Sequence, residues 1–218
     1  MNKAFIFDMD GVIVNSEQAW SKHGSNFLKE LFGEEIAKKI GDPIGMTVNT
    51  IYGIAAQNGF SMDKNKYLEI YDKQAAHIYS KANITEGVEK LAQALLKSGY
   101  KMGLVSSSRL KWINHVLPKL SFGKHFEHII SVNDRPDLKP KPNPGSYLET
   151  IAKLEASPKT TIILEDSNSG IKVAKLSGAF TIGFNQNLIP GYKQNGADIY
   201  ANNMFEVVKI IQSFRVSF

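Results

Sequence analysis

The chain has 218 residues, of which 43% are hydrophobic and 22% are charged. A chain of this length and composition can bury a sizeable core, and it is neither disordered nor collagen-like. It carries 26 Lys and Arg against 21 Asp and Glu, a net charge of +5. The lysines are scattered and no basic binding motif is present, so we expect no nucleic-acid partner.

The sequence lacks three features of membrane and secreted proteins: a membrane span, a signal peptide and cysteine. No apolar run is long enough to span a membrane, and the N-terminus has no basic region followed by a long apolar stretch. The absence of cysteine excludes disulfides, thiolate nucleophiles and cysteine-ligated metals. We therefore expect a cytoplasmic protein with no membrane partner.

A short apolar run at residues 4–7 opens the chain and ends in two carboxylates, Asp8 and Asp10. The unbroken run predicts a strand that is buried on both faces of a parallel sheet, and Gly11 allows a turn after it. Two like charges at a buried strand end are costly unless a cation or a proton relieves them. An ordinary alternative remains open, in which both aspartates cap the following turn or helix.

Helical patterns follow with no strand among them. They lie near Ser16–Leu31, with Asn15 or Ser16 as a cap, and near Glu34–Ile40, Thr47–Gln57 and Asp63–Tyr79. Residues 15–80 are therefore predicted to form a helical cap domain inserted into an α/β core of residues 1–14 and 81–218.

From Ala82 onward, strand and helix patterns alternate, which is typical of a doubly wound parallel sheet. The predicted strands are Lys101–Val105, His128–Ser131, Thr161–Leu164, Phe180–Phe184 and Ile199–Tyr200. The predicted helices are Gly87–Ser98, Lys111–Leu117, Gly145–Leu154, Ser169–Ser177 and Met204–Phe214. The fold class is thus α/β.

Polar clusters follow several of these strands, where open parallel sheets bind ligands. They are Asp8 with Asp10, Ser106-Ser107-Ser108-Arg109 and Glu165-Asp166-Ser167, and a proline-rich loop adds Lys139-Pro140-Lys141-Pro142. Carboxylates from two strands can hold Mg²⁺, and hydroxyls, amides and a lysine can hold phosphate. Each cluster also has an ordinary explanation as a helix cap, a turn or a surface lysine, but together they indicate phosphoryl transfer.

Four motifs make the chain resemble the haloacid-dehalogenase-like hydrolase superfamily, and within it the β-phosphoglucomutase-like phosphatases and mutases with a helical cap. The motifs are Asp8-Met9-Asp10-Gly11-Val12, Ser106 after an apolar strand, Lys139-Pro140, and Glu165-Asp166-Ser167-Asn168-Ser169-Gly170-Ile171. The resemblance covers essentially the whole chain.

This resemblance implies a role for each motif. Asp8 would be the nucleophile that forms an aspartyl-phosphate, and Asp10 the general acid and base. Mg²⁺ would be the cofactor. Its protein ligands would be Asp8, the backbone carbonyl of Asp10, Asp166 and, directly or through water, Glu165. The phosphate would be bound by Ser106, Ser107 and Lys139.

The cap bears on the choice between phosphatase and mutase. The family's sugar-phosphate mutases carry an arginine after a Gly-x-Ser/Thr segment, and this chain has Val48 after Gly45-Met46-Thr47. Valine cannot bind a phosphate dianion, which favours a phosphatase for a sugar or polyol phosphate. A β-phosphoglucomutase-type mutase is the alternative, with Arg109 or Lys22 as a substitute cation.

Trp20 and Thr47 are the cap residues predicted to meet the substrate. Trp20 would stack on an apolar face of the substrate, or else pack between cap helices. His23, three residues after Trp20, is more simply a packing or surface residue.

The partner is expected to be a small phosphorylated metabolite, and the chain a monomer or weak homo-oligomer. A non-catalytic module that binds a phosphorylated metabolite is a remote alternative. A dinucleotide-dependent dehydrogenase is excluded because no GxGxxG follows a strand.

Overall fold

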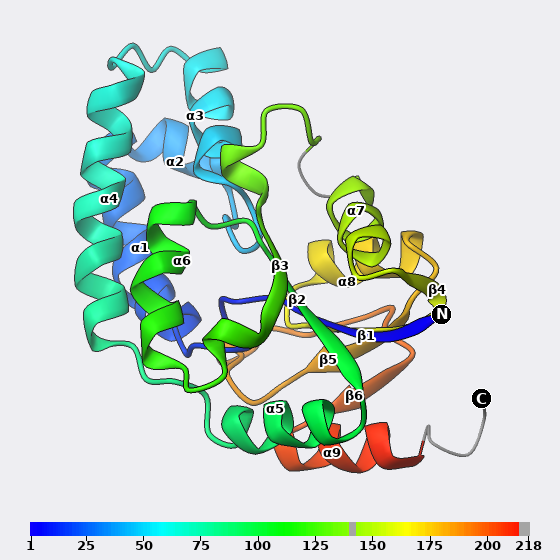
Figure 1. Cartoon of the computed structure of the whole chain (residues 1–218). Helices are drawn as coiled ribbons and strands as arrows, with labels where there is room; N and C mark the ends of the chain where they lie inside the picture. The colour runs from blue at the N-terminus through cyan, green and yellow to red at the C-terminus, as the bar shows by residue number, and fades with distance from the viewer. Residues whose placement is uncertain (140–142, 214–218) are drawn as a thin grey trace.

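The computed structural model describes residues 1–139 and 143–213, without the side chains of residues 17 and 21–25. Its six strands form one parallel sheet in the order β3-β2-β1-β4-β5-β6 (Figure 1). The strands are β1 (Asn2–Phe7), β2 (Tyr100–Ser106), β3 (Phe126–Ser131), β4 (Ala156–Glu165), β5 (Phe180–Phe184) and β6 (Ile199–Ala201). The predicted α/β class, with a doubly wound parallel sheet, is confirmed.

Strand β1 lies at the centre of the sheet because its residues are apolar on both faces. Phe5 and Phe7 belong to one buried cluster, and Ala4 and Ile6 belong to the cluster on the opposite face. All four side chains are completely buried. The chain winds to one side of β1 through β2 and to the other through β4, so the strand order reverses between β1 and β4.

Helices cover both faces of this sheet. Helices α5 (Val88–Lys97) and α9 (Met204–Ser213) lie on one face, and α7 (Gly145–Lys153) and α8 (Asn168–Leu176) lie on the other (Figure 1). Helix α6 (Leu110–Val116) follows β2 and contacts the cap helix α4.

The cap consists of α1 (Glu17–Phe32), α2 (Glu34–Ile40), α3 (Val48–Gln57) and α4 (Lys64–Lys81). In the described chain no named strand lies between β1 and α5. Tyr67 anchors the interior of the cap, since it is completely buried and its hydroxyl donates to the Val48 carbonyl at 2.8 Å. None of the described helices combines the length and apolarity that a membrane span requires.

Cap and core are joined by a partly buried polar contact at Asp72 of α4. Its Oδ1 accepts hydrogen bonds from Arg109 Nη1 and Trp112 Nε1, both at 2.7 Å. Burial disfavours the charged carboxylate, but these donors and the nearby cations outweigh it and lower the pKa of Asp72. A second contact runs from the Asn49 side-chain amide to the Asn133 carbonyl at 2.8 Å.

Most predicted element boundaries agree with the structure within two residues. The largest difference is β4, which begins at Ala156 instead of Thr161 because Asn2 pairs with Ala156 before a register shift. The first half of β4 is mostly polar, so the apolar pattern did not predict it as part of the strand. Short 3₁₀ helices at Leu117–Lys119, Gly123–His125 and Val132–Asp134 were also missed. The predicted end of the last helix, Phe214, lies outside the described residues.

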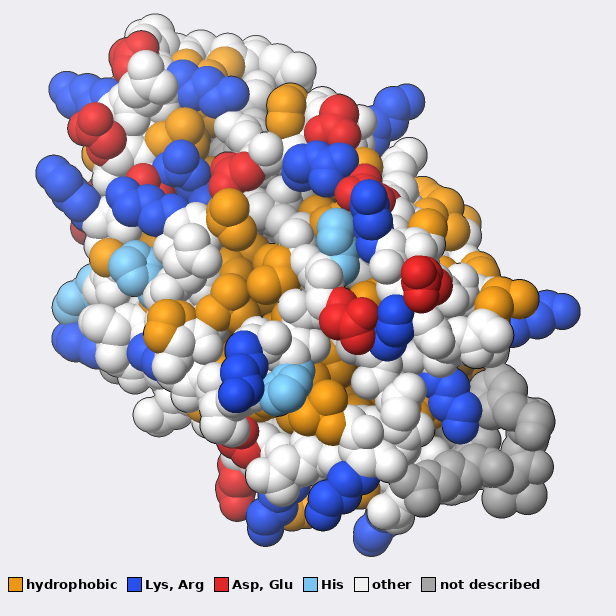
Figure 2. Space-filling view, viewed as in Figure 1, with side chains coloured by type: hydrophobic (Ala, Val, Ile, Leu, Met, Phe, Trp, Pro, Cys, Tyr) orange, Lys and Arg blue, Asp and Glu red, His pale blue; other side chains and the backbone are white. Residues whose placement is uncertain are grey.

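Lys and Arg side chains are interspersed with Asp and Glu on the face shown in Figure 2. They form no continuous basic stripe on this face, which agrees with the scattered lysines of the sequence. The absence of a nucleic-acid partner stays a prediction.

Candidate active site

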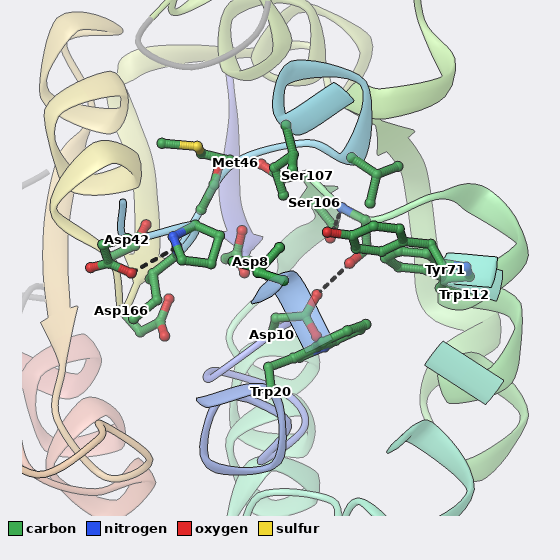
Figure 3. A pocket seen from close by; sticks show the side chains of 18 of the residues that line it. Asp8, Asp10, Trp20, Asp42, Met46, Tyr71, Ser106, Ser107, Trp112 and Asp166 are labelled. Atoms are coloured by element: carbon green, nitrogen blue, oxygen red, sulfur yellow. Dashed lines mark hydrogen bonds between the residues drawn. The ribbon is translucent and has the colours of Figure 1, made fainter. Parts of the chain in front are cut away.

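A cavity of about 290 Å³ lies between the cap and the carboxyl ends of β1, β2 and β4 (Figure 3). In this view Asp8 lies between Asp166 and Asp10, with Trp20 below and Met46 above. On the core side the lining residues are Asp8, Asp10, Ser106, Ser107, Ser108, Trp112, Asp166, Ser167 and Ile189. The structure therefore brings polar residues from three strand ends to one space.

Three buried carboxylates form the centre of the site. Oxygens of Asp8, Glu165 and Asp166 lie within 4.8 Å of one another, and the three residues are 6%, 0% and 4% exposed. Strands β1 and β4 are hydrogen-bonded neighbours, and the Asp8 amide donates to the Leu164 carbonyl at 3.0 Å. Like charges so close and so buried repel strongly, and oxygen ligands of this kind suit a hard divalent cation.

Glu165 is held from two sides. The hydroxyl of Tyr147, on α7, donates to its Oε1 at 2.5 Å, and the Ser167 hydroxyl lies 3.3 Å from its Oε2. A Cβ atom at Gly170 would lie 2.0 Å from the Glu165 carboxylate, so only glycine leaves room for it. Burial, followed by the Glu165 charge, raises the pKa of Tyr147, which keeps this hydroxyl protonated as a donor. The sequence patterns did not indicate Tyr147, since it looks like an ordinary apolar-face residue of its helix.

Asp10 lies beside this cluster and accepts hydrogen bonds from three hydroxyl groups. Ser16 donates to Oδ1 at 2.6 Å, Tyr79 donates to Oδ1 at 2.7 Å, and Ser108 donates to Oδ2 at 2.6 Å. Burial, followed by the charge of Asp10, raises the pKa of Tyr79, so its hydroxyl also stays a donor. These contacts fix the orientation of the Asp10 carboxylate.

The geometry at Asp10 bears on two sequence expectations. Ser16 occupies the first position before α1, but its side chain makes no capping bond and binds Asp10 instead. The Asp10 side chain is not part of the three-carboxylate cluster. The metal-binding role expected for Asp10 concerned its backbone carbonyl, and it stays a prediction.

Ser106 and Ser107 both line the cavity, as expected for phosphate-binding residues. Ser106 Oγ accepts the Ser108 amide at 3.0 Å, and Ser107 Oγ donates to the Gly45 carbonyl of the cap at 3.0 Å. Lys139, in contrast, is exposed and is not among the residues that line the cavity. The neighbouring Lys141, which is also followed by a proline, lies outside the described residues.

On the cap side, Trp20 lines the cavity as predicted, and its ring also packs 5.8 Å from that of Trp112. Its ring also stacks on that of Tyr71 in the cap helix α4, whereas stacking on a substrate stays a prediction. Thr47 does not line the cavity. Its Oγ1 accepts the Thr50 amide at 3.0 Å and caps α3.

Neither substitute cation is shown in the cavity. Arg109 is paired with Asp72 at 2.7 Å and is not a lining residue, and the side chains of Lys22 and His23 lie outside the described residues. Val48 does line the cavity, so the position after Thr47 presents an apolar side chain to the site.

The fold and this site define a capped α/β protein with buried carboxylates where the strand order of its sheet reverses. Residues 5–184 match the model of the haloacid dehalogenase-like hydrolases, and the chain belongs to this family. The resemblance inferred from the four motifs is thereby confirmed.

Two curated relatives and one solved structure illustrate the similarity. Hexitol phosphatase B of Escherichia coli K12 is 30% identical over 182 residues, or 79% of this chain and 78% of that protein. The β-phosphoglucomutase of Bacillus subtilis 168 is 28% identical over 207 residues, 90% of this chain and 88% of that protein. The structure of CbbY from Rhodobacter sphaeroides in complex with phosphate matches with a TM-score of 0.74 at 17% identity, covering 95% of this chain and 96% of that chain.

We predict that Gly170→Ala weakens binding of a divalent cation at least tenfold, because the added methyl group displaces the Glu165 carboxylate. Overpacking should also lower the free energy of unfolding by about 1–3 kcal/mol. Calorimetric titration with Mg²⁺ and urea unfolding measure the two effects. The control is Gly53→Ala in α3, where an added Cβ meets nothing within 4 Å. It should be up to about 1 kcal/mol more stable, with unchanged Mg²⁺ binding.

We predict that Lys139→Ala changes kcat/KM less than about threefold, because an exposed side chain outside the cavity contributes little to binding. Steady-state hydrolysis of p-nitrophenyl phosphate measures this. Lys141→Ala, assayed in parallel, tests whether the second lysine of the same loop binds phosphate. A loss of about 100-fold in kcat/KM for Lys139→Ala would contradict this prediction and show that Lys139 contributes to the active site.

Proposed function

We propose that the protein is a Mg²⁺-dependent phosphatase that hydrolyses a small organic phosphate monoester through an aspartyl-phosphate at Asp8. The observation that carries this proposal is the pairing of two differently held aspartates at one cavity. Asp8 belongs to a cluster of three buried carboxylates, whereas Asp10 is held by three hydroxyl groups. The family match and the phosphatase relative support it.

In this mechanism an Asp8 oxygen attacks phosphorus and the bond to the leaving oxygen breaks. Asp10 gives a proton to the leaving oxygen. It then takes one from a water whose oxygen attacks phosphorus, and the bond from phosphorus to Asp8 breaks. The hydroxyls of Ser16, Tyr79 and Ser108 keep the Asp10 carboxyl group in one orientation. They come from three separate segments, so the hydrogen bonding of Asp10 depends on how the cap packs against the core.

The carboxylates of Asp8, Glu165 and Asp166 fit a Mg²⁺ ion, because all three offer hard oxygen ligands and their mutual repulsion needs a cation. When bound, Mg²⁺ would neutralise the negative charge that shifts between phosphate oxygens in the transition state. Tyr147 then has a supporting role, since its hydroxyl orients Glu165. Ser106 and the Ser107 amide would bind phosphate oxygens.

We predict that Asp8→Asn lowers kcat at least about 10³-fold, since an amide is a poor nucleophile towards phosphorus. Stability should be unchanged or higher, because one of three adjacent buried charges is removed. Mg²⁺-dependent release of p-nitrophenol and urea unfolding provide the two measurements. Asp63→Asn, an exposed helix cap outside the cavity, is the matched control. Activity near that of the wild type in Asp8→Asn would refute the covalent mechanism.

The runner-up function is a β-phosphoglucomutase-type mutase, which the Bacillus subtilis relative supports. The residues that line the cavity favour the phosphatase over the mutase. Val48 stands where the family's mutases have a phosphate-binding arginine, and among the described lining residues there is no Lys or Arg. A second phosphate group would find no cationic partner there.

We predict that β-glucose 1-phosphate with glucose 1,6-bisphosphate yields no glucose 6-phosphate and that any turnover releases inorganic phosphate. A coupled dehydrogenase assay detects the former and a molybdate assay the latter. Formation of glucose 6-phosphate without net phosphate release would assign the protein to the mutases.

Other sequence expectations are retained as part of this proposal. They are a core of residues 1–14 and 81–218 with a cap of residues 15–80, a cytoplasmic location, and a monomer or weak homo-oligomer. A sugar or polyol phosphate is the substrate class that the sequence predicts and that the hexitol phosphatase relative supports, and it is the alternative to the apolar leaving group inferred below.

A further inference from the structure

The cavity wall opposite the carboxylates is formed by apolar side chains of the cap and one core helix. Val48 and Ile51 of α3 line it, and both are 4% exposed. The rings of Trp20, Tyr71 and Trp112 line it as well, with Tyr71 and Trp112 stacked at 13° and 6.4 Å between ring centroids. Because these rings pack against one another, they present one continuous surface.

Two described polar side chains beside this wall, Trp112 and Ser107, already have hydrogen-bond partners. Trp112 Nε1 donates to Asp72, so the indole offers its ring to the cavity. The hydroxyl of Ser107 donates to the Gly45 carbonyl. Among the described side chains of this wall, the hydroxyl of Tyr71 is the polar group that is buried without a hydrogen-bond partner.

This wall suits a polyol poorly. A hexitol chain would bury several hydroxyls against it, and each buried hydroxyl without a partner costs about 1–3 kcal/mol. An apolar ring gains free energy on the same surface and requires no partners.

The charges around the cavity also restrict the leaving group. Its described ionisable lining residues are Asp8, Asp10, Asp42, Tyr71 and Asp166, so every charged one is acidic. Asp42 is exposed and is not one of the three clustered carboxylates. A bound cation offsets the central cluster, but Asp42 still repels a second anionic group. A carboxylate or second phosphate on the leaving group is therefore disfavoured.

From these observations, and resting on the proposed phosphatase function, we infer that the natural leaving group is a small, uncharged, largely apolar alcohol with one ring. It carries at most one polar group, which would meet the Tyr71 hydroxyl. The cavity has a volume of about 290 Å³, just below the ~300–1,000 Å³ that is usual for ligand pockets. Only a small alcohol fits in it.

Three esters test this inference on the wild-type enzyme with Mg²⁺: benzyl phosphate, sorbitol 6-phosphate and phosphocholine. All three release an ordinary alkanol, so the chemical step is similar and kcat/KM compares how the wall accepts each leaving group. We expect kcat/KM for benzyl phosphate to exceed the other two at least tenfold. A preference for sorbitol 6-phosphate would overturn the inference. A preference for phosphocholine would also overturn it, by showing that the aromatic wall binds a cation.

Acetyl phosphate, whose leaving group is too small to cover the wall, separates this inference from the proposed function. If acetyl phosphate and p-nitrophenyl phosphate are not hydrolysed, the phosphatase proposal itself fails. If they are hydrolysed and benzyl phosphate is not preferred, the phosphatase proposal stands and the apolar leaving group is refuted.

A matched pair on α3 tests the wall directly. Ile51→Thr places a hydroxyl in the lining, and should lower the ratio of kcat/KM for benzyl phosphate to that for acetyl phosphate about tenfold. Ile54→Thr changes a partly buried isoleucine of the same helix outside the lining, and should leave this ratio unchanged. If urea unfolding shows that Ile51→Thr is unfolded, the nearly isosteric Val48→Thr replaces it. Equal ratios in the wild type and the folded lining variant would contradict the inference.

Discussion

The pairing of β1 with β4 is the interaction on which the site depends. It places Asp8, just after β1, beside Glu165 and Asp166 at the end of β4, with carboxylate oxygens within 4.8 Å. Such a cluster is unfavourable in isolation, because burial and mutual repulsion both oppose the charged forms. The surrounding structure compensates with the Tyr147 hydroxyl on Glu165 and with space at Gly170. The result is a buried cluster of carboxylates that could hold a metal ion.

The second organising feature is the contact of the cap with Asp10. Tyr79 lies at the end of α4, Ser16 just before α1 and Ser108 just after β2, and all three donate to one carboxylate. Asp72 strengthens the same junction through Arg109 and Trp112. The cap therefore contributes to the orientation of Asp10 as well as to the walls that surround the substrate. In the proposed mechanism, proton transfer and substrate selection depend on the same closed arrangement.

Much of the fold was predictable because its signals are local. The buried run before Asp8 predicts a central strand, and strand and helix patterns alternate after Ala82. The polar half of β4 was missed because its pairing with Asn2 is a long-range contact that leaves no apolar pattern. Ser16, predicted together with Asn15 as a cap of the first helix, does occupy the N-cap position of α1, but its side chain makes no capping bond. A serine before a helix normally binds the helix backbone, but here a nearby carboxylate competes for its hydroxyl.

The sequence by itself determined the α/β fold class, the helical insertion and the aspartates and serines of the strand ends, because these depend on periodicity and on short motifs. Only the tertiary structure decided which groups surround Asp8 and Asp10, since Glu165, Tyr79 and Ser108 come from segments far along the chain. It also showed that Arg109 pairs with Asp72, that Lys139 is exposed, and that Val48 and Ile51 line the cavity. Side-chain direction and pairing arise from packing between distant elements, and no local pattern in the sequence records them.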